Sequence, residues 1–506
     1  MNNSFYITTP IYYPSGKPHL GHAYCTLACD ALARFNRLEG KNVLFATGTD
    51  EHGQKIQQKA DELKITPQEY VDNMRKDFKT LTPLMNFSND DFISTTEERH
   101  KKAAQEMWKR LEKAGYIYKS TYSGWYCVSD EAYFTEEELV DGKSPDSGNP
   151  VEWMEEDSYF FKLSAFTDKL LEFYEQNPDF IQPEIRRNEI ISFVKQGLQD
   201  ISISRSKFNW GVPVPGDEKH VMYVWIDALT NYLTVAGFPE KDITEFWPAN
   251  AHVVGKDIAR FHCIYWPAML IAADIPTPKT VFVHGHWVAE DGRKMSKSLG
   301  NVIDPYEVVD QFGQDQLRLY LLSAITFGGD GSFSKDAFIA KSNSYLANDL
   351  GNLFQRVLSF AHKNFDGKIP ALGELTDEDK AFLANFEGLA DRVKAQMDDY
   401  KINSAIEEIW TCVRAANKYM EEQHPWTYKK EDPAKCGHIL RVLMESFKFL
   451  ACLTEPFIPT GAAKLANQLG YEKLTLADLN ELISLQEGKE FDKPEGVFAR
   501  IQIEEA

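Results

Sequence analysis

The stretch GKPHLGHAY, residues 16–24, places two histidines three residues apart with a glycine between them. A short β-rich run, residues 5–9, comes before it and is followed by a loop rich in proline, glycine and serine. Apolar residues recur at helical spacing over residues 20–35, and a second apolar run follows at residues 43–46. This order of strand, loop, helix and strand is typical of the start of a doubly wound parallel sheet. Sites in such sheets lie at the carboxyl ends of the strands, so we expect the histidines there, at a helix N-terminus.

The histidine pair, His19 and His22, is compatible with a metal site, a phosphate site or simple packing. The helical zinc pattern of metalloproteases needs histidines four apart with a glutamate inside, and this pair has neither. A phosphate site gains from the helix N-terminus, where unpaired N–H groups and the positive end of the helix dipole face an anion. Imidazole N–H groups would add donors, and Gly21 would let a flat base approach the backbone. On their own these residues leave all three interpretations open.

A second motif lies far downstream, where residues 291–301 read DGRKMSKSLGN. Lys294 and Lys297 stand three apart in a stretch rich in serine and glycine, where two ammonium groups can close over a polyphosphate. A solvated turn is the simpler interpretation of a lone lysine pair. The combination with a histidine pair after the first strand is more specific than either motif and favours a nucleotide site.

The composition is that of a multidomain globular protein. The chain has 506 residues, 43% of them hydrophobic and 13% aromatic, and should hold about two to four domains. Its formal net charge of -21 argues against a general nucleic-acid coat or a membrane-surface protein, although it leaves room for a local basic groove. Seven scattered cysteines favour a reduced compartment. No targeting segment or membrane-length apolar run is found, so we expect a cytoplasmic protein without a membrane partner.

The composition and the apolar pattern of the rest of the chain change twice. Residues 115–201 are aromatic and acidic, which indicates a small inserted domain. Strand-like runs then return at residues 221–225, 252–254 and 280–283. Beyond residue 342 apolar stripes recur at three- and four-residue steps, one of them behind a capping box at residues 376–379, which indicates a helical bundle. We therefore expect an α/β fold: a doubly wound parallel-sheet domain with a small inserted domain, followed by an α-helical bundle. The expected ranges are 1–114 and 219–283 for the sheet domain, 115–218 for the insertion, 284–341 for the junction with the lysine loop and 342–506 for the bundle.

The two motifs together resemble the signatures of class I aminoacyl-tRNA synthetases, HLGH at residues 19–22 and KMSKS at residues 294–298. The resemblance implies a Rossmann-like catalytic domain that uses ATP with Mg²⁺. It also implies four catalytic residues that stabilise the transition state in which an amino acid carboxylate attacks the α-phosphate of ATP, namely His19, His22, Lys294 and Lys297. The residues expected to border the ATP are Lys17, Gly21, Gly255, Asp257, Met295, Ser296 and Ser298.

The resemblance sharpens to the methionyl-tRNA synthetases and covers essentially the whole chain. Four further stretches carry it: IYY at residues 11–13, TDEHG at 49–53, YVWIDALTNY at 223–232 and GKDIARFH at 255–262. It implies that Asp50 holds the ammonium group of L-methionine, with Arg205 and Lys256 at the adenylate end. The implied side-chain pocket comprises Ile11, Tyr13, Trp225, Ala228, Leu229, Tyr232, Ile258 and His262. A thioether favours aromatic edges and accepts hydrogen bonds weakly, so an indole with a hydroxyl or imidazole donor suits it.

Simpler interpretations remain for parts of this pocket and for the insertion. Trp225 could be plain core, and the run DEH at residues 50–52 could be a metal cluster. Many methionyl enzymes carry zinc knuckles in the insertion, but the matching places here read CVSD at residues 127–130 and SPDS at 144–147. One thiolate falls short of the four ligands of a structural zinc site, so we expect no metal there and no zinc. The insertion would instead be held by its aromatic residues: Trp125, Tyr126, Tyr133, Trp153 and Phe160.

In the helical region the resemblance implies that Asn352, Arg356 and Trp426 bind the anticodon of methionine tRNAs, initiator and elongator alike. A tryptophan can stack on an unpaired base, although an ordinary capping asparagine and a buried tryptophan are the alternative. We expect a monomer, because no dimer-forming tRNA-binding domain follows. The predicted function is attachment of L-methionine to tRNA through a methionyl-adenylate, with release of AMP and pyrophosphate. A small-molecule adenylyltransferase and an inactive, synthetase-like tRNA-binding protein are the alternatives.

Overall fold

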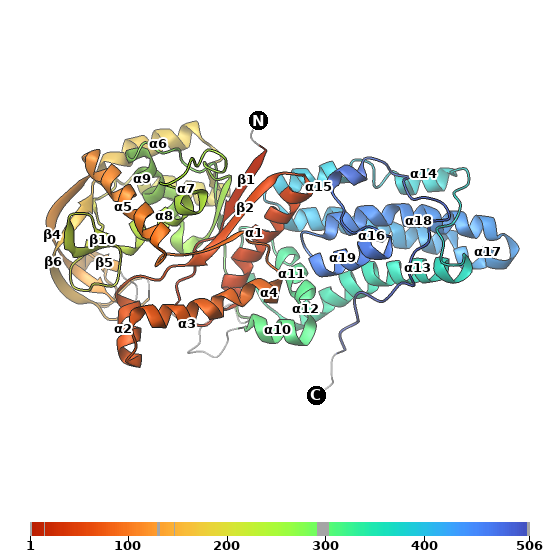
Figure 1. Cartoon of the computed structure of the whole chain (residues 1–506), viewed down its shortest axis with the longest axis horizontal. Coiled ribbons are helices and arrows are strands. Elements are labelled where there is room, and N and C mark those ends of the chain that lie inside the picture. The colour runs from red at the N-terminus through yellow and green to blue at the C-terminus, as the bar shows by residue number, and fades with distance from the viewer. Residues whose placement is uncertain (1–2, 15, 129–131, 146, 291–302, 503–506) are drawn as a thin grey trace. The chain divides into compact units, whose positions relative to one another are not determined.

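The computed structural model describes residues 3–14, 16–128, 132–145, 147–290 and 303–502, and Figure 1 labels its helices and strands. The predicted lysine loop, with Lys294, Met295, Ser296, Lys297 and Ser298, lies outside these described residues. The chain divides into two units. Unit 1 comprises residues 1–18, 43–82 and 89–284, and unit 2 comprises residues 19–42, 83–88 and 285–506.

Unit 1 is built on a six-stranded sheet in the order β3-β2-β1-β12-β13-β7. The strands are β1 (Ser4–Thr8), β2 (Asn42–Thr49), β3 (Asp91–Ser94), β7 (Ile181–Gln182), β12 (Ala251–Gly255) and β13 (Val281–His284). The pairs β1–β12, β12–β13, β13–β7 and β2–β3 are parallel. The predicted doubly wound parallel sheet is therefore confirmed. Its strand order reverses between β1 and β12, which is where such sheets bind ligands at the carboxyl ends of their strands.

One strand prediction is wrong. The apolar run at residues 221–225 does not rejoin the parallel sheet, because β11 (Asp217–Met222) ends within it and pairs antiparallel with β10 (Pro213–Val214) and β9 (Ser204–Arg205). Helix α8 (Val224–Ala236) begins directly afterwards, with Tyr223 as its N-cap. A short buried apolar run fits a strand and a helix equally well, so periodicity could not separate the two.

The expected insertion contains a second, antiparallel sheet in the order β5-β4-β6-β8. Its strands are β4 (Ile117–Cys127), β5 (Ala132–Phe134), β6 (Glu152–Phe161) and β8 (Ile201–Ser202). Tyr126 and Phe160 are buried as expected, whereas Trp153 is 56% exposed and meets Trp125 edge-to-face. The edge strand β7 also falls inside the range expected for the insertion, although it pairs with the parallel sheet.

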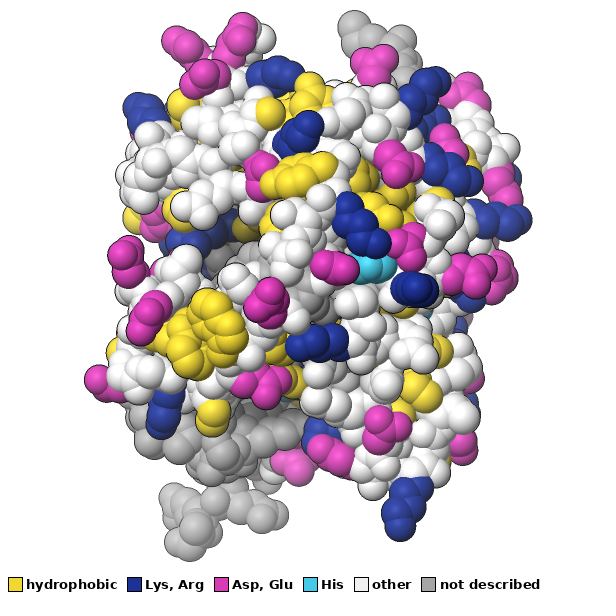
Figure 2. All heavy atoms as spheres, turned by 90° about the vertical axis from the view of Figure 1, so that its left-hand side faces the viewer, with side chains coloured by type: hydrophobic (Ala, Val, Ile, Leu, Met, Phe, Trp, Pro, Cys, Tyr) yellow, Lys and Arg dark blue, Asp and Glu magenta, His cyan; other side chains and the backbone are white. Residues whose placement is uncertain are grey.

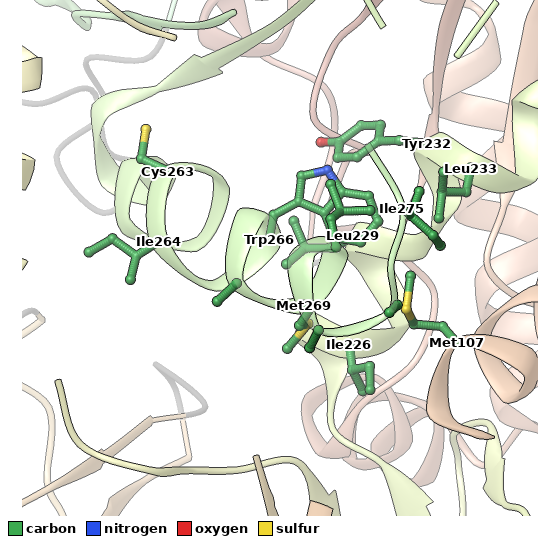
Figure 3. Packing of buried hydrophobic residues seen from close by; sticks show 14 of the residues in the cluster. Met107, Ile226, Leu229, Tyr232, Leu233, Cys263, Ile264, Trp266, Met269 and Ile275 are labelled. Atoms are coloured by element: carbon green, nitrogen blue, oxygen red, sulfur yellow. The ribbon is translucent and has the colours of Figure 1, made fainter. Parts of the chain in front are cut away.

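The main core of unit 1 lies around α8, the short π-helix η4 (Phe261–Tyr265) and α9 (Trp266–Ala272). Figure 3 shows Leu229 and Tyr232 from α8 beside Trp266, with Leu233 beyond Ile275 and Met107 from α5 (Glu98–Lys113) in the same cluster. Trp266 and Tyr232 are buried, and their rings lie 6.1 Å apart between centroids. This packing fixes the helix that carries Trp225, Ala228, Leu229 and Tyr232 of the predicted methionine pocket.

Unit 2 begins with α1 (Leu20–Leu38), the helix predicted after the first strand, and continues as a helical domain. In Figure 1 the long helices α16 (Ile402–Gln423) and α18 (Pro433–Thr454) run beside α13 (Asn352–Asn364). The predicted capping box is present, since Thr376 and Asp379 cap each other's backbone at the start of α14 (Asp377–Leu383). The apolar stripe behind it is buried but divided, because α15 (Leu389–Asp398) starts as a separate helix after Gly388 at a φ of 62°.

Further elements occur among the described residues. Up to residue 258 they are α2 (Gln54–Leu63), α3 (Pro67–Lys79), α4 (Leu81–Met85), η1 (Glu136–Glu138), η2 (Leu163–Phe166), α6 (Thr167–Gln176), α7 (Glu184–Val194) and η3 (Lys256–Ile258). Unit 2 adds β14 (Trp287–Val288), α10 (Pro305–Phe312), α11 (Gln314–Ser323), β15 (Gly331–Ser332), α12 (Lys335–Lys341), η6 (Ser342–Gly351), α17 (Pro425–Glu431), α19 (Pro459–Gln468) and η7 (Leu476–Leu479). Across the described ranges, we find no helix whose length and apolarity would suffice to cross a membrane. On the face shown in Figure 2, acidic and basic side chains are interspersed.

Candidate active site

The two histidines form a capping box at the start of α1. His19 is the N-cap, and its Nδ1 accepts a hydrogen bond from the Gly21 N–H at 3.1 Å. In return, the Nδ1 of His22 accepts from the His19 N–H at 3.2 Å, and the two rings stack with centroids 3.7 Å apart. Because each Nδ1 is an acceptor, a neutral imidazole at either position carries its proton on Nε2. The turn therefore orients two Nε2–H donors from a helix N-terminus.

The lack of a side chain at Gly21 leaves room for the imidazole of His19 in this turn. A Cβ at this position would lie 3.0 Å from Cε1 and 3.2 Å from Nδ1 of His19. The imidazole of His19 thus lies so close to Gly21 that it would have to shift to admit a Cβ at this position. The prediction that Gly21 admits a flat base is not required to explain this glycine.

Helix α1 is anchored within unit 2 by a buried ionic cluster around Asp30. The carboxylate of Asp30 contacts Arg318 Nη2 at 2.7 Å and Arg34 Nε at 2.9 Å, and it accepts from Ser88 N–H at 2.6 Å. Burial raises the pKa of Asp30. The two guanidinium groups and the hydrogen bonds from Ser88 lower it by more than burial raises it, so the net shift is downward. Arg34 also bonds Glu455 at 2.6 Å. The helix that presents the histidines is therefore tied to α11 and to the segment after α18.

The residues of the predicted methionine pocket lie in unit 1, and hydrogen bonds link three of them, Tyr232 on α8, Ile258 in η3 and His262 in η4. The Tyr232 hydroxyl lies 2.7 Å from His262 Nε2, and His262 Nδ1 lies 3.0 Å from the Ile258 carbonyl. A carbonyl only accepts, so His262 carries its proton on Nδ1 and accepts from Tyr232 through Nε2. Burial lowers the pKa of His262 to about 4, which keeps the ring neutral at pH 7. The sequence suggested that Tyr232 or His262 donates a hydrogen bond to the thioether. In the structure the Tyr232 hydroxyl donates to His262, and His262 Nδ1–H donates to the Ile258 carbonyl.

Trp225 stacks on Phe261, a residue that sequence reasoning missed. Their ring centroids are 3.5 Å apart and the planes differ by 10°. Trp225 is partly buried at the edge of the main core, and Ala228 and Leu229 are buried one turn further along α8. Phe261 directly precedes His262 in the sequence, so its place beside the pocket could have been suspected from that motif alone.

The run DEH at residues 50–52 is not a metal cluster, because its members bind different partners. Asp50 is buried just past β2, and its N–H bonds the Tyr12 carbonyl at 2.8 Å. The carboxylate of Glu51 accepts a hydrogen bond from Arg75 Nε at 2.7 Å, whereas His52 Nδ1 lies 2.6 Å from Asp227 Oδ2.

Asp227 joins this segment to the pocket helix, because it also meets His100 Nε2 at 2.8 Å. Burial raises the pKa of Asp227, but His52 and His100 outweigh it and bring the pKa to about 2. The carboxylate is thus ionised, and it connects the end of β2 to the first turn of α8.

The other predicted residues flank the carboxyl ends of the strands. Ile11 and Tyr13 follow β1 and are partly buried, and Lys55 lies over the Tyr13 ring at 5.6 Å. Gly255 ends β12, and Lys256, Asp257 and Ile258 form η3 directly after it. Lys17 is exposed. Arg205 ends β9, is buried, and places its guanidinium 3.9 Å from the Tyr223 ring centroid.

In the helical domain the structure brings Arg356 and Trp426 together. The guanidinium of Arg356 on α13 lies 5.8 Å from the Trp426 ring centroid, and His424 meets the same indole edge-to-face at 5.4 Å. Trp426 is 43% exposed, which excludes the alternative that it is buried core. Asn352 is exposed at the first position of α13, whose N-cap is Gly351, so Asn352 does not cap the start of that helix. The three residues therefore offer polar and aromatic groups to solvent.

No group of three or more His, Cys, Asp or Glu residues that could hold a metal occurs among the described residues. Cys127 is buried and free of disulfides, as are the other six cysteines. Within the two stretches compared with zinc knuckles, residues 127–130 and 144–147, Ser129, Asp130 and Asp146 lie outside the described residues.

The fold and the histidine turn together define a nucleotide-binding α/β enzyme with an appended helical domain. The sequence pattern of the family described as "tRNA synthetases class I (M)" matches residues 5–150 and 136–358. The pattern described as "Anticodon binding domain of methionyl tRNA ligase" matches residues 369–506.

Relatives agree over the full length. The chain is 51% identical to a methionine–tRNA ligase of Brucella suis biovar 1 over 98% of both chains, and 50% identical to that of Rhizobium meliloti over 99% of both. It is also similar in structure to Mycobacterium tuberculosis methionyl-tRNA synthetase in complex with methionyl-adenylate, with a TM-score of 0.95 and 46% identity. That match covers 98% of this chain and 100% of the other. The chain belongs to the family of methionine-specific class I aminoacyl-tRNA synthetases, which are ligases that join an amino acid to tRNA.

Proposed function

We propose that the chain joins L-methionine to methionine tRNAs, initiator and elongator, in two steps. A carboxylate oxygen of methionine attacks the α-phosphorus of ATP, the bond to the bridging oxygen breaks, and pyrophosphate leaves. A ribose hydroxyl at the tRNA end then attacks the carbonyl carbon of methionyl-adenylate, loses its proton to solvent and displaces AMP. ATP is proposed to enter as its Mg²⁺ complex.

The observation that carries this proposal is the histidine capping box. Both Nδ1 atoms are engaged by backbone N–H groups, which directs Nε2–H donors outward from the start of α1. Donors fixed in advance stabilise the charge that develops on phosphoryl oxygens without any reorganisation during the step. His19 and His22 would thus act on the transition state rather than on ground-state binding. Lys294 and Lys297, with Met295, Ser296 and Ser298, are proposed to complete the phosphate site together with Lys17 and Gly21.

Selection of methionine is proposed for the pocket of unit 1. Asp50 would bind the ammonium group, with Ile11, Tyr13, Ala228 and Leu229 along the side chain. Trp225 offers an indole face already stacked on Phe261. The hydroxyl of Tyr232 donates its hydrogen bond to His262, so it would not donate to the methionine sulfur. The thioether would instead contact the aromatic rings and the hydroxyl oxygen of Tyr232. Gly255, Lys256, Asp257 and Arg205 are proposed for the nucleotide and adenylate end.

Recognition of the tRNA is proposed for the helical domain, residues 342–506. Trp426 is exposed enough to stack on an unpaired base, and Arg356 lies over the same indole. Asn352 adds amide groups that can pair with base edges in a single-stranded loop. We further propose residues 1–114 and 219–283 for the catalytic domain, 115–218 for the insertion and 284–341 for the junction. We also propose that the protein is a monomer, that it is located in the cytoplasm and that it binds no zinc.

The test is amino-acid-dependent exchange of pyrophosphate into ATP with each of the twenty amino acids. Exchange with methionine is expected, whereas a small-molecule adenylyltransferase or an inactive relative would show none. His22→Ala should lower the exchange rate by roughly 100- to 1,000-fold with little change in methionine affinity, because one donor to developing charge is lost. His362→Ala, on α13, is the matched control and should retain full exchange. If methionine affinity falls as much as the rate does, the histidine binds substrate and the assigned role is wrong.

A further inference from the structure

His252 packs against Tyr232, a residue of the predicted methionine pocket, and takes no part in the motifs found in the sequence. It stands on β12 and is fully buried. Its ring stacks on the Tyr232 ring with centroids 4.1 Å apart and planes 27° from parallel. Tyr232 in turn reaches His262 with its hydroxyl. The imidazole of His252 therefore packs against the Tyr232 ring, and the imidazole of His262 accepts a hydrogen bond from the Tyr232 hydroxyl.

The orientation of His252 is fixed from both ring nitrogens. Trp266 Nε1–H donates to His252 Nε2 at 3.3 Å, and His252 Nδ1 lies 2.8 Å from the Thr8 hydroxyl. Since an indole N–H only donates, Nε2 is the acceptor and the proton of the neutral ring stays on Nδ1. Burial lowers the pKa of His252 well below its ordinary value, so this single tautomer persists at pH 7. The plane of the ring is thereby locked to β1 and α9.

The Tyr232 side is held as well. Tyr6 donates from its hydroxyl to the Tyr232 carbonyl at 2.8 Å, which fixes the backbone of that residue. The contacts of the Tyr232 side chain include the stack on His252, the hydrogen bond to His262 and the Trp266 ring, whose centroid lies 6.1 Å away. A bulky aromatic ring can tilt about its Cβ unless a neighbouring surface opposes it, and His252 supplies that surface.

We propose that His252 is a positioning residue that selects the thioether side chain by holding the Tyr232 ring in place. This inference rests on the proposed function, because it assumes that methionine binds beside Tyr232. His252 itself does not touch the substrate. Its effect should appear in the affinity for the amino acid and not in the chemical step.

Two substitutions separate the stack from the hydrogen bonds. His252→Phe keeps an aromatic ring under Tyr232 but leaves the Trp266 N–H and the Thr8 hydroxyl without their partner, so it should lower stability. His252→Asn keeps polar groups but removes the ring. In pyrophosphate exchange, His252→Asn should raise the KM for methionine by about tenfold or more, the scale of a lost pocket contact, with kcat and the KM for ATP changed little. His252→Phe should stay within about threefold of the wild-type KM for methionine.

Norleucine, which replaces the sulfur by a methylene group, provides a second measurement. The ratio of kcat/KM for methionine over norleucine should fall in His252→Asn and be retained in His252→Phe. Equal KM increases in both variants, or an unchanged ratio in His252→Asn, would overturn the inference. If His252→Asn does not fold, His252→Leu fills the same space without an aromatic face and makes the same comparison. Absence of methionine-dependent exchange in the wild type would instead refute the proposed function, so the two failures are distinguishable.

Discussion

Gly21→Ala tests whether the glycine of the histidine turn serves His19. The added Cβ would lie 3.0 Å from Cε1 and 3.2 Å from Nδ1 of His19, closer than side chains normally approach. The imidazole must therefore move, which weakens the 3.1 Å bond from the Gly21 N–H and the 3.7 Å stack on His22. Loss of an N-cap bond costs about 1 kcal/mol. Alanine is favoured over glycine in a helix by about the same amount, so the stability should change by less than about 1 kcal/mol.

The exchange rate should respond far more strongly. A displaced donor to developing charge loses up to about 3 kcal/mol of transition-state stabilisation, so we expect a decrease of roughly 10- to 100-fold. Urea unfolding and pyrophosphate exchange at saturating methionine and ATP measure the two quantities. His19→Asn is the matched control, because asparagine caps helices well but carries no imidazole. It should keep stability and lose rate.

The double variant decides the mechanism. If Gly21 acts through His19, the double variant should exchange at the rate of His19→Asn alone, because neighbouring residues in one unit are not additive. A further tenfold loss from Gly21→Ala in the His19→Asn background would show that the methyl group blocks the nucleotide directly. Full exchange in the single Gly21→Ala variant would refute the reasoning entirely.

Three further predictions follow from the two units. Asp30→Asn should cost about 3–5 kcal/mol in urea unfolding, because it leaves buried guanidinium groups without their carboxylate. The lowered pKa of Asp30 stabilises the fold above the ordinary aspartate pKa near 4 and loses that contribution as pH falls further, so the wild type should be more acid-sensitive than the variant. Trp426→Ala should reduce methionine transfer to tRNA by roughly tenfold or more and leave exchange intact, and a parallel fall of both activities would make the indole structural. Elemental analysis should find less than one zinc per chain, and a stoichiometric amount would mean that Cys127 has ligand partners in the residues the structure does not describe.

Much of the fold could be predicted because it follows from periodicity. The strand, helix and strand at the N-terminus and the runs at residues 252–254 and 280–283 are strong local patterns, and all belong to the elements expected. The short strands β3 and β7 escaped notice, since four and two residues carry almost no periodic signal. The run at residues 221–225 was misassigned for a related reason, because apolar residues at the start of a buried helix look like a strand.

The site was less predictable than the fold, because much of it depends on contacts between distant segments. The histidine motif indicated an anion site, but the sequence could not show that the histidines cap one helix reciprocally. The stack of Trp225 on Phe261 and the support of Tyr232 by His252 join different elements and leave no periodic trace. The direction of the protons in the Tyr232–His262 pair required the position of the Ile258 carbonyl.

The ionic cluster around Asp30 bears on how this enzyme can be cut. Arg318 donates to the carbonyls of Pro456 and Phe457, and Arg34 binds Glu455, so residues beyond α18 satisfy buried cations of the region that carries the histidines. A fragment that ends before residue 342 would keep both arginines and Asp30 but lose Glu455 and the two carbonyls, and buried guanidinium N–H groups without acceptors destabilise a fold. We expect substitution of Trp426 to impair tRNA charging alone, whereas proteolytic or genetic removal of the helical region should also destabilise the part of the chain that carries the histidines.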